Sequence, residues 1–166
     1  PYNIAPLNFY VSADDSEQGI VLTYGDLRVS AISEDGAIIP DLDEWKSLLD
    51  KAKGHELKLE HCIRTDEGWK AYDSFAIHVS AEGIDPYLVY RLIPPGYETW
   101  NEMGLYQRNL ENFDESVIIE NKNAGYNCVN CHSFCMHDPE MMMFHSRAVN
   151  AGTILIRNGE LQKLDT

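Results

Sequence analysis

Polar and apolar residues alternate along several short stretches in the first 95 residues. In the segment 57–64, every second residue is Leu, His or Ile, and the residues between them are Lys, Glu, Cys and Arg. A period of two places successive side chains on opposite faces of a sheet, so each such stretch predicts a β-strand. Turn-forming residues such as Asp66-Glu67-Gly68 separate the stretches and favour an antiparallel meander. The predicted strands are Ile20–Tyr24, Leu27–Ile32, 57–64, Trp69–Ser80 and Tyr87–Ile93.

One segment departs from this alternation and has the helical period instead. Asp41 precedes it as a candidate N-cap, and Glu44 follows three residues later, as in a capping box. Lys51 lies in the expected last turn, where a cation interacts favourably with the helix dipole. These signals predict a helix inserted among the strands, with an apolar stripe that covers part of the sheet. The residues of that stripe are Leu42, Trp45, Leu48, Leu49 and Ala52.

Together these elements predict a mainly-β chain in two parts. Residues 1–95 are expected to form an immunoglobulin-like antiparallel β-sandwich that contains the inserted helix. Residues 96–166 are expected to form a smaller module, irregular or α+β, that contains a cysteine-rich motif. We expect this module to end in a hairpin, because Asn158-Gly159 is a residue pair that two-residue hairpin loops prefer.

The charge balance restricts the partners of the chain. Its 166 residues include 27 Asp and Glu against 13 Lys and Arg, which gives a formal net charge of −14. A nucleic acid would be repelled, whereas a basic protein would be attracted. Uninterrupted apolar stretches are only a few residues long, far below the roughly 20 that a membrane helix needs, so no membrane span is expected. The chain begins with Pro1, so a signal peptide would not be included, and we expect it to continue beyond Thr166.

Three of the four cysteines are close together near the C-terminal end. Cys128, Cys131 and Cys135 fall within eight residues, and His132 directly follows Cys131. Residues 128–132 have the sequence Cys-Val-Asn-Cys-His, which is the attachment pattern for c-type haem. Two thiols at this spacing reach the vinyl groups on one edge of a porphyrin, and the adjacent imidazole binds the iron. The motif predicts haem c attached at Cys128 and Cys131, with His132 as proximal ligand.

A haem that only transfers electrons needs a sixth iron ligand, which His or Met can supply. We favour His145 or a methionine of the run that precedes it, because methionines provide an apolar, polarisable wall. His137 would need a tight loop to reach the opposite face of the porphyrin. Against a ligand role, consecutive methionines are more often gap-filling core residues. The candidates are Met136, His137, Met141, Met142, Met143 and His145, with His61 and His78 as more distant ones.

The same cluster also fits two structural roles. Its thiols and a neighbouring imidazole have acceptable spacing for a tetrahedral zinc site. In an oxidising compartment, a disulfide such as Cys128–Cys131 is the other alternative. A thioredoxin-type dithiol has less support, because no βαβ unit is predicted around the motif. The alternative zinc ligands are Cys128, Cys131, Cys135 and His137, with His132 or His145 as substitutes for the last.

Catalytic motifs are absent from the sequence. It contains no Gly-x-Ser-x-Gly, no P-loop, no Gly-x-Gly-x-x-Gly and no His-Glu-x-x-His. Its acidic residues are scattered over predicted turns and helix starts. We therefore assign no catalytic residue and favour an electron-transfer or binding domain over an enzyme. The enzymatic alternative is a peroxidase-like haem with an open sixth position.

Short stretches spread over nearly the whole chain form a recognisable set: Asn3–Phe9, Tyr90–Tyr97, Tyr106–Leu110, Asn127–Phe134, Met143–His145 and Gly152-Thr153. They resemble a family of bacterial envelope proteins in which a β-rich N-terminal region with a Cys-x-x-Cys-His motif precedes a TolB-like, WD40-like β-propeller. The resemblance implies export across the inner membrane of a Gram-negative cell, haem attachment at Cys128 and Cys131, and a propeller after Thr166. It also favours His145 as a site residue.

These observations lead to one main hypothesis and one rival. The main hypothesis is an exported domain of the periplasm or cell envelope that binds one covalent haem c. It would transfer electrons or sense redox state, with a redox or envelope protein as its partner. The rival is a non-redox adhesion or ligand-binding sandwich of the envelope, in which the cysteine cluster is a structural zinc or disulfide site.

Overall fold

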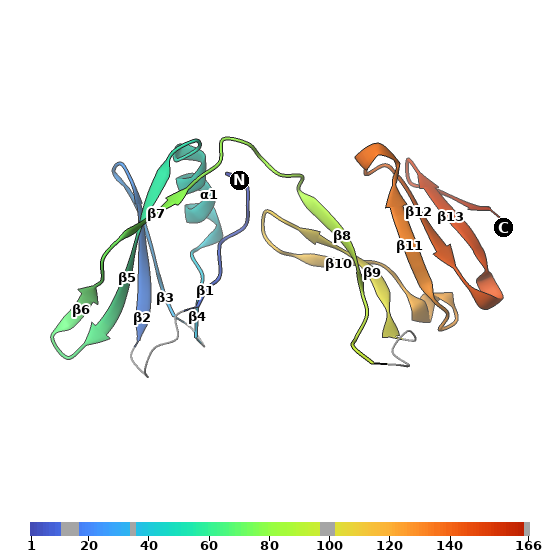
Figure 1. The fold of residues 1–166 in the computed structure, drawn as a ribbon, viewed down its shortest axis with the longest axis horizontal. Coiled ribbons are helices and arrows are strands. Elements are labelled where there is room, and N and C mark those ends of the chain that lie inside the picture. Colours follow the sequence, from blue (N-terminus) through green and yellow to red (C-terminus); the bar gives the residue numbers. More distant parts are fainter. Residues whose placement is uncertain (11–16, 34–35, 97–101, 165–166) are drawn as a thin grey trace. The chain divides into compact units, whose positions relative to one another are not determined.

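A computed structural model describes residues 1–10, 17–33, 36–96 and 102–164 of the chain. The fold is mainly β, with several antiparallel sheets and, among the described residues, a single α-helix (Figure 1). The chain divides into two compact units: unit 1 contains Pro1–Pro86 and Asn109–Phe113, and unit 2 contains Tyr87–Arg108 and Asp114–Thr166. Tyr97, which ends one of the stretches that carry the resemblance, lies outside the described residues. No described helix has the length and apolar character that crossing a membrane would require.

Unit 1 is built around a five-stranded antiparallel sheet. The strand order is β3-β2-β5-β6, and β7 also pairs with β5 because β5 is long enough to accept two partners along the same edge. A separate two-stranded sheet joins β1 to β4. The strands are β1 (Phe9–Tyr10), β2 (Gln18–Tyr24), β3 (Leu27–Ile32), β4 (Ala37–Ile38), β5 (Glu56–Thr65), β6 (Gly68–Ala71) and β7 (Phe75–His78).

The predicted helix is confirmed as α1 (Leu42–Lys51). The Asp41 carboxylate accepts hydrogen bonds from the backbone N–H groups of Asp43 and Glu44, at 3.0 and 3.1 Å. These bonds satisfy donors that the first turn of a helix otherwise leaves unpaired. The apolar stripe of the helix is buried except for Leu42, which is half-buried, and the Trp45 indole donates to the carbonyl of Ile4 at 2.8 Å.

The core of unit 1 lies between the helix and one face of the sheet. Leu57 and Leu59 of β5 and Leu22 of β2 are fully buried there, together with Trp45 and Leu48 of the helix. Their burial follows the alternation of the sequence, since Leu22 and Leu59 are directly paired and therefore project from the same face. Each such side chain contributes about 1.5–3 kcal/mol of hydrophobic stabilisation.

The described residues of unit 2 form two antiparallel sheets. Strands β8 to β10 form a three-stranded sheet in the order β10-β9-β8, and β11 to β14 form a four-stranded meander. The described 3₁₀ turns η2 (Asn121–Ala124), η3 (Cys135–His137) and η4 (Ala148–Asn150) connect strands in this unit. The strands are β8 (Tyr87–Leu92), β9 (Gly104–Asn109), β10 (Glu115–Glu120), β11 (Val129–Phe134), β12 (Met141–Ser146), β13 (Gly152–Arg157) and β14 (Glu160–Leu164).

The two sheets of unit 2 share one hydrophobic core. Leu105 of β9 is packed with Met142 and Phe144 of β12, and partly buried isoleucines of β10 and β13 surround them. The segment that was predicted to be irregular or α+β contains regular antiparallel sheets among its described residues. The predicted boundary between residues 95 and 96 falls inside unit 2, since β8 is hydrogen-bonded to β9.

The predicted C-terminal hairpin is confirmed. Arg157 of β13 pairs with Glu160 of β14, which leaves Asn158 and Gly159 as a two-residue loop. Both loop residues have positive φ, 52° and 79°. Asn and Gly tolerate this left-handed conformation better than other residues, which is why the pair marks such turns in a sequence.

The N-cap of α1 allows a direct test of this part of the fold. We expect Asp41→Ala to lower the stability of the helical region by about 1 kcal/mol, because two backbone donors lose their acceptor. Urea unfolding followed by the far-ultraviolet circular dichroism of the helix measures the change. Asp50→Ala is the matched control: Asp50 is exposed in the last turn, so its removal does not destabilise the helix. Equal destabilisation by both substitutions would contradict the capping role.

Candidate cofactor-attachment site

The Cys-x-x-Cys-His motif lies at the start of β11, an edge strand of the four-stranded sheet among the described strands. Val129, inside the motif, is fully buried and pairs with Ser146 of β12. The carbonyl of Cys128 accepts a hydrogen bond from the backbone N–H of Arg147 at 3.1 Å. The first half of the motif is thus fixed to the sheet, and the Cys128 side chain is half-buried.

The register of β11 against β12 shifts inside the motif. Asn130 pairs with His145 and Ser133 pairs with Met143, so Cys131 and His132 together stand opposite Phe144. Two residues opposite one is the arrangement of a β-bulge, which removes a residue from the ladder and re-aims its side chain. Cys131 has a φ of 58°, a left-handed conformation that is uncommon for a residue other than glycine. The bulge exposes the Cys131 thiol while His132 stays half-buried.

The other cysteine-cluster residues do not gather with this pair. Cys135 and His137 follow β11 in the 3₁₀ turn η3, where Cys135 is exposed and His137 has a φ of 65°. None of the four cysteines, all of them described, forms a disulfide. Within the described part of the chain, no group of three or more His, Cys, Asp or Glu side chains is arranged to hold a metal ion. The structure therefore does not bring together the alternative zinc ligands.

Strand β12 separates the candidate sixth ligands between its two faces. Met142 and Phe144 are buried in the core of unit 2, at 6% and 4% exposure. Met141, Met143 and His145 alternate with them and belong to the opposite face, where Met143 is 44% exposed. Met142 is therefore a core residue, which is the usual role of a methionine in such a run. Met141, Met143 and His145 are the candidate ligands that remain accessible.

The more distant histidine candidates belong to unit 1. His61 in β5 contacts the Gln18 side-chain oxygen at 3.1 Å and stacks on Tyr72, with 5.2 Å between ring centroids. His78 ends β7 and pairs with Glu56. These contacts agree with the structural role that a histidine in an alternating strand usually has.

The residues at the motif suit a covalent haem in chemistry and in access. Two unpaired thiols and an imidazole lie at the start of an edge strand, whose outer edge pairs with no further described strand. Large apolar side chains are exposed on either side of the motif along the chain, since Tyr126 is 66% and Met136 is 92% exposed. A porphyrin is a largely apolar group, so such side chains could pack against it. Cys131 is exposed, whereas Cys128 is half-buried.

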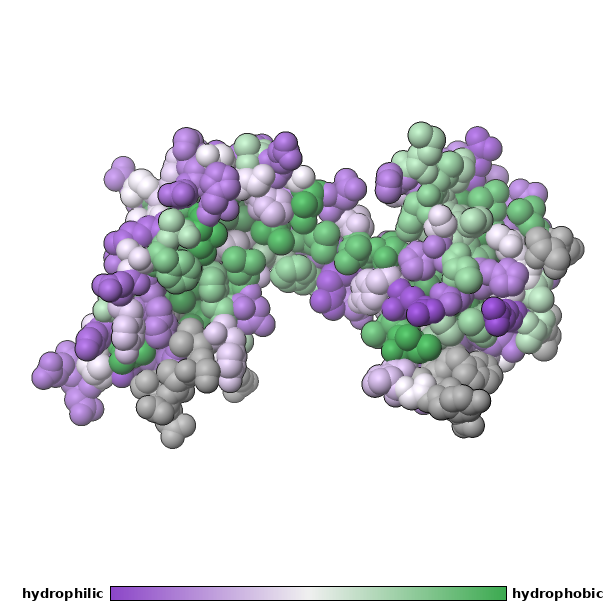
Figure 2. Space-filling view, viewed as in Figure 1, coloured by the Kyte–Doolittle hydropathy of each residue, from purple (hydrophilic) through white to green (hydrophobic). Residues whose placement is uncertain are grey.

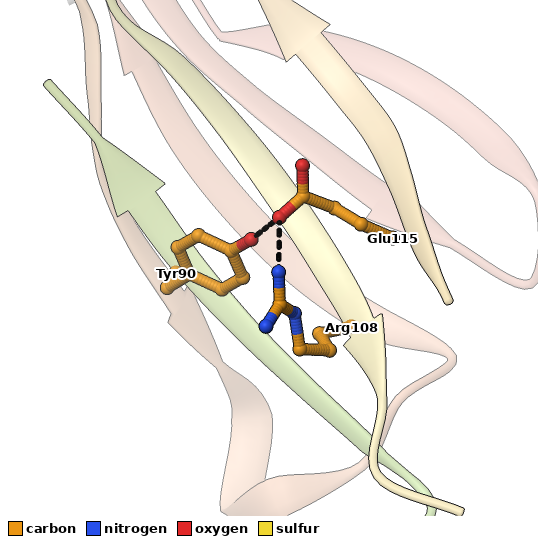
Figure 3. A network of polar contacts seen from close by, with 3 residues as sticks. All are labelled: Tyr90, Arg108 and Glu115. Atoms are coloured by element: carbon orange, nitrogen blue, oxygen red, sulfur yellow. Dashed lines mark hydrogen bonds and ion pairs between the residues drawn. The ribbon is translucent and has the colours of Figure 1, made fainter. Parts of the chain in front are cut away.

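Sequence reasoning missed a polar network on the three-stranded sheet. The Tyr90 hydroxyl donates to the Glu115 carboxylate, and the Arg108 guanidinium bonds to the same carboxylate at 3.0 Å (Figure 3). Arg108 and Glu115 are directly opposite each other on β9 and β10. The charges of the two residues were visible in the sequence, but their pairing depends on a register that no local motif specifies.

A second network on the same sheet shifts the pKa values of its members. The Lys122 ammonium and the Tyr106 hydroxyl both donate to the Glu120 carboxylate, the latter at 2.9 Å. The hydrogen bond from Lys122, followed by that from Tyr106, lowers the pKa of Glu120. The hydrogen bond to Glu120 raises the pKa of Tyr106 and of Lys122. Glu120 is therefore ionised at neutral pH and holds both partners.

Comparisons with known proteins give no further constraint: no family model, no curated protein and no solved structure matches the chain. Both hydrophilic and hydrophobic residues are exposed on the visible face of each unit (Figure 2).

The Glu120 network predicts a measurable pH dependence. We expect the Glu120 carboxyl to titrate below the ordinary glutamate pKa, and Lys122→Met to raise its pKa toward that value. Because the folded-state pKa is lowered, the stabilisation is present above the unfolded-state pKa and is lost as the pH falls through the folded-state pKa. Carbon-13 NMR of the side-chain carboxyl measures the titration. Lys58→Met, which removes the partner of Glu60 in unit 1, is the control that leaves Glu120 unchanged. An ordinary Glu120 pKa in the wild type would contradict the network.

Proposed function

We propose that this chain binds one haem c covalently, through thioethers at Cys128 and Cys131, and transfers electrons or senses redox state. The observation that supports the proposal most strongly is the β-bulge at Cys131-His132 on the edge strand β11. A bulge inside an attachment motif gives an exposed thiol and an adjacent imidazole at an open sheet edge. His132 is the proximal ligand in this proposal. The haem, when bound, supplies one-electron redox chemistry.

The protein residues in this proposal hold and orient the group. Cys128 is fixed by the hydrogen bond between its carbonyl and Arg147, whereas Cys131 is displaced from the ladder. Thioethers would therefore attach the haem at Cys128, which is hydrogen-bonded to the sheet, and at Cys131, which lies in the bulge. Of the predicted sixth ligands, Met141, Met143 and His145 lie on the accessible face of β12 and are favoured over the buried Met142.

The location and the partners belong to the same proposal. A periplasmic or envelope location, a β-propeller that follows the chain and a redox or envelope protein partner are implied by the family resemblance alone. A formal net charge of −14 supports a basic partner and predicts that salt weakens the encounter. The immunoglobulin-like sandwich type remains a prediction for unit 1, where α1 and the sheet share the core.

A ligand-binding role without haem is the second candidate. It is favoured by exposed aromatic side chains on and between the two strands that follow each other along one edge of β5: Trp69 in β6, Phe75 in β7 and Tyr72 between them. Aromatic side chains contribute strongly to interfaces, because they bury a large area at a small cost in entropy. In this case the cysteines would be structural, and the unit 1 aromatics would contact the ligand.

The two candidates differ in one direct measurement. When the full chain is exported together with a cytochrome c maturation system, we expect a mass increase of one haem and a Soret band. Cys131→Ser should abolish the two-thioether product, because one attachment point is lost, while Cys135→Ser should leave it unchanged. Intact mass spectrometry and visible spectroscopy provide both results.

The opposite result is equally clear. An unmodified mass, with stoichiometric zinc or with a disulfide, would exclude the haem function and support the ligand-binding candidate. Under that candidate, Cys131→Ser changes thermal stability without any change in visible absorption. The circular dichroism spectrum of each variant shows whether the chain is folded, so loss of haem can be separated from loss of structure.

A further inference from the structure

One face of β12 presents three soft metal donors in alternation. Met141, Met143 and His145 are separated by one residue each, and the residues between them, Met142 and Phe144, are buried on the other face. Consecutive donors on one strand face are roughly 6.6 Å apart along the backbone. A thioether and an imidazole at this separation can reach one ion between them, because both side chains extend several ångströms from the strand. The three donors include no carboxylate and no thiol.

The cross-strand neighbours leave the centre of this face without charge. Met143 is flanked by Ser133 of β11 and Leu155 of β13. His145 is flanked by Asn130 and Thr153. None of these four neighbours carries a charge that would repel or replace a monovalent cation. The Met141 end differs, since Arg157 lies opposite Met141 and is itself paired in register with Glu160. Met143 and His145 are therefore the centre of the site, and Met141 is its third, outer donor.

The His145 ring has a contact that would orient it for metal binding. Its Nδ1 atom lies 3.4 Å from the Thr153 hydroxyl oxygen, which is directly opposite on β13. Histidines that bind metals usually use one ring nitrogen as ligand and hydrogen-bond the other to a neighbouring group. With Nδ1 directed at Thr153, Nε2 is the nitrogen that remains for an ion. This contact distinguishes His145 from a histidine whose ring rotates freely.

We propose that Met143 and His145, with Met141 as third ligand, bind a monovalent copper ion on the accessible face of β12. Soft thioether donors select Cu(I), imidazole is compatible with it, and Mg²⁺ or Ca²⁺ would require oxygen ligands that this set lacks. The proposal goes beyond the haem function: its donors are also the favoured sixth ligands for haem, but none of them belongs to the Cys-x-x-Cys-His motif, so copper binding requires no attached haem. It involves binding alone and requires no redox step.

The cysteines must be removed before this site can be tested, because thiolates also bind Cu(I). The test protein is the full chain with Cys128→Ser, Cys131→Ser and Cys135→Ser, which are positions with exposed or half-buried side chains. This protein cannot form the thioethers of haem c. Its copper binding therefore succeeds or fails independently of the proposed haem function.

The experiment is an anaerobic Cu(I) titration of this protein in competition with the chromophoric chelator bicinchoninate. We expect one equivalent of Cu(I) to be retained. Met143→Leu and His145→Gln should each weaken Cu(I) binding by roughly tenfold or more. Substituting a residue that only hydrogen-bonds a metal ligand already lowers metal affinity by about this factor, and these two substitutions remove the ligands themselves. Met141→Leu should cause a smaller loss. Met142→Leu is the matched control: it changes a methionine of the same strand on the buried face, and binding should be unchanged.

Three outcomes would overturn the proposal. The first is that bicinchoninate retains all the copper. The second is that Met143→Leu and His145→Gln bind as tightly as the parent, which would assign the copper to another group such as the half-buried Cys62 thiol. The third is that Met142→Leu weakens binding as much as Met143→Leu, which would mean that either face serves equally. Circular dichroism of each variant establishes that it is folded before its affinity is compared.

Discussion

The pairing of β11 with β12 is the constraint on which the candidate site depends. The register of the two strands shifts by one residue inside the motif: Asn130 is opposite His145, but Ser133 is opposite Met143. The extra residue therefore falls at Cys131-His132. A regular ladder would place Cys131 and His132 on opposite faces of the sheet, since side chains alternate along a strand. The bulge removes that alternation at the two positions where the attachment motif needs a thiol and an imidazole close together.

This pairing is held in place by the core of unit 2. Phe144 lies opposite the bulge and is 4% exposed, and it packs with Leu105 of the other sheet. Burial of such side chains is worth about 1.5–3 kcal/mol each, and interiors are packed too densely for a strand to shift easily. A shift of β12 by one residue would bring Met143 and His145 into the core and expose Phe144. The same packing therefore determines the bulge and the accessible donor face.

The sequence predicted those features that depend on local chemistry. The helix followed from Asp41 and a stripe of helical period, and the terminal hairpin followed from Asn158-Gly159. The faces of β12 could not be predicted in this way, because three consecutive methionines show no alternation until the neighbouring sheet buries one of them. The Arg108–Glu115 pair was equally hidden, since it depends on the register between two strands. The bulge at Cys131 could not be predicted either, because it is defined by the register of β11 against β12.

A bulge on an edge strand has a role that requires no cofactor: it disrupts the row of free backbone groups and discourages edge-to-edge association. That protective role explains a bulge somewhere in β11, and many residue types could form it. It does not explain why the left-handed position is Cys131 rather than glycine or asparagine, which adopt this conformation at lower cost. A strained and exposed thiol, followed by an imidazole, is a costly way to protect an edge. The positive φ alone does not distinguish Cys131, because Tyr126, Met136 and His137 also have positive φ. It is the exposed thiol next to a half-buried imidazole that supports the proposed attachment of a group.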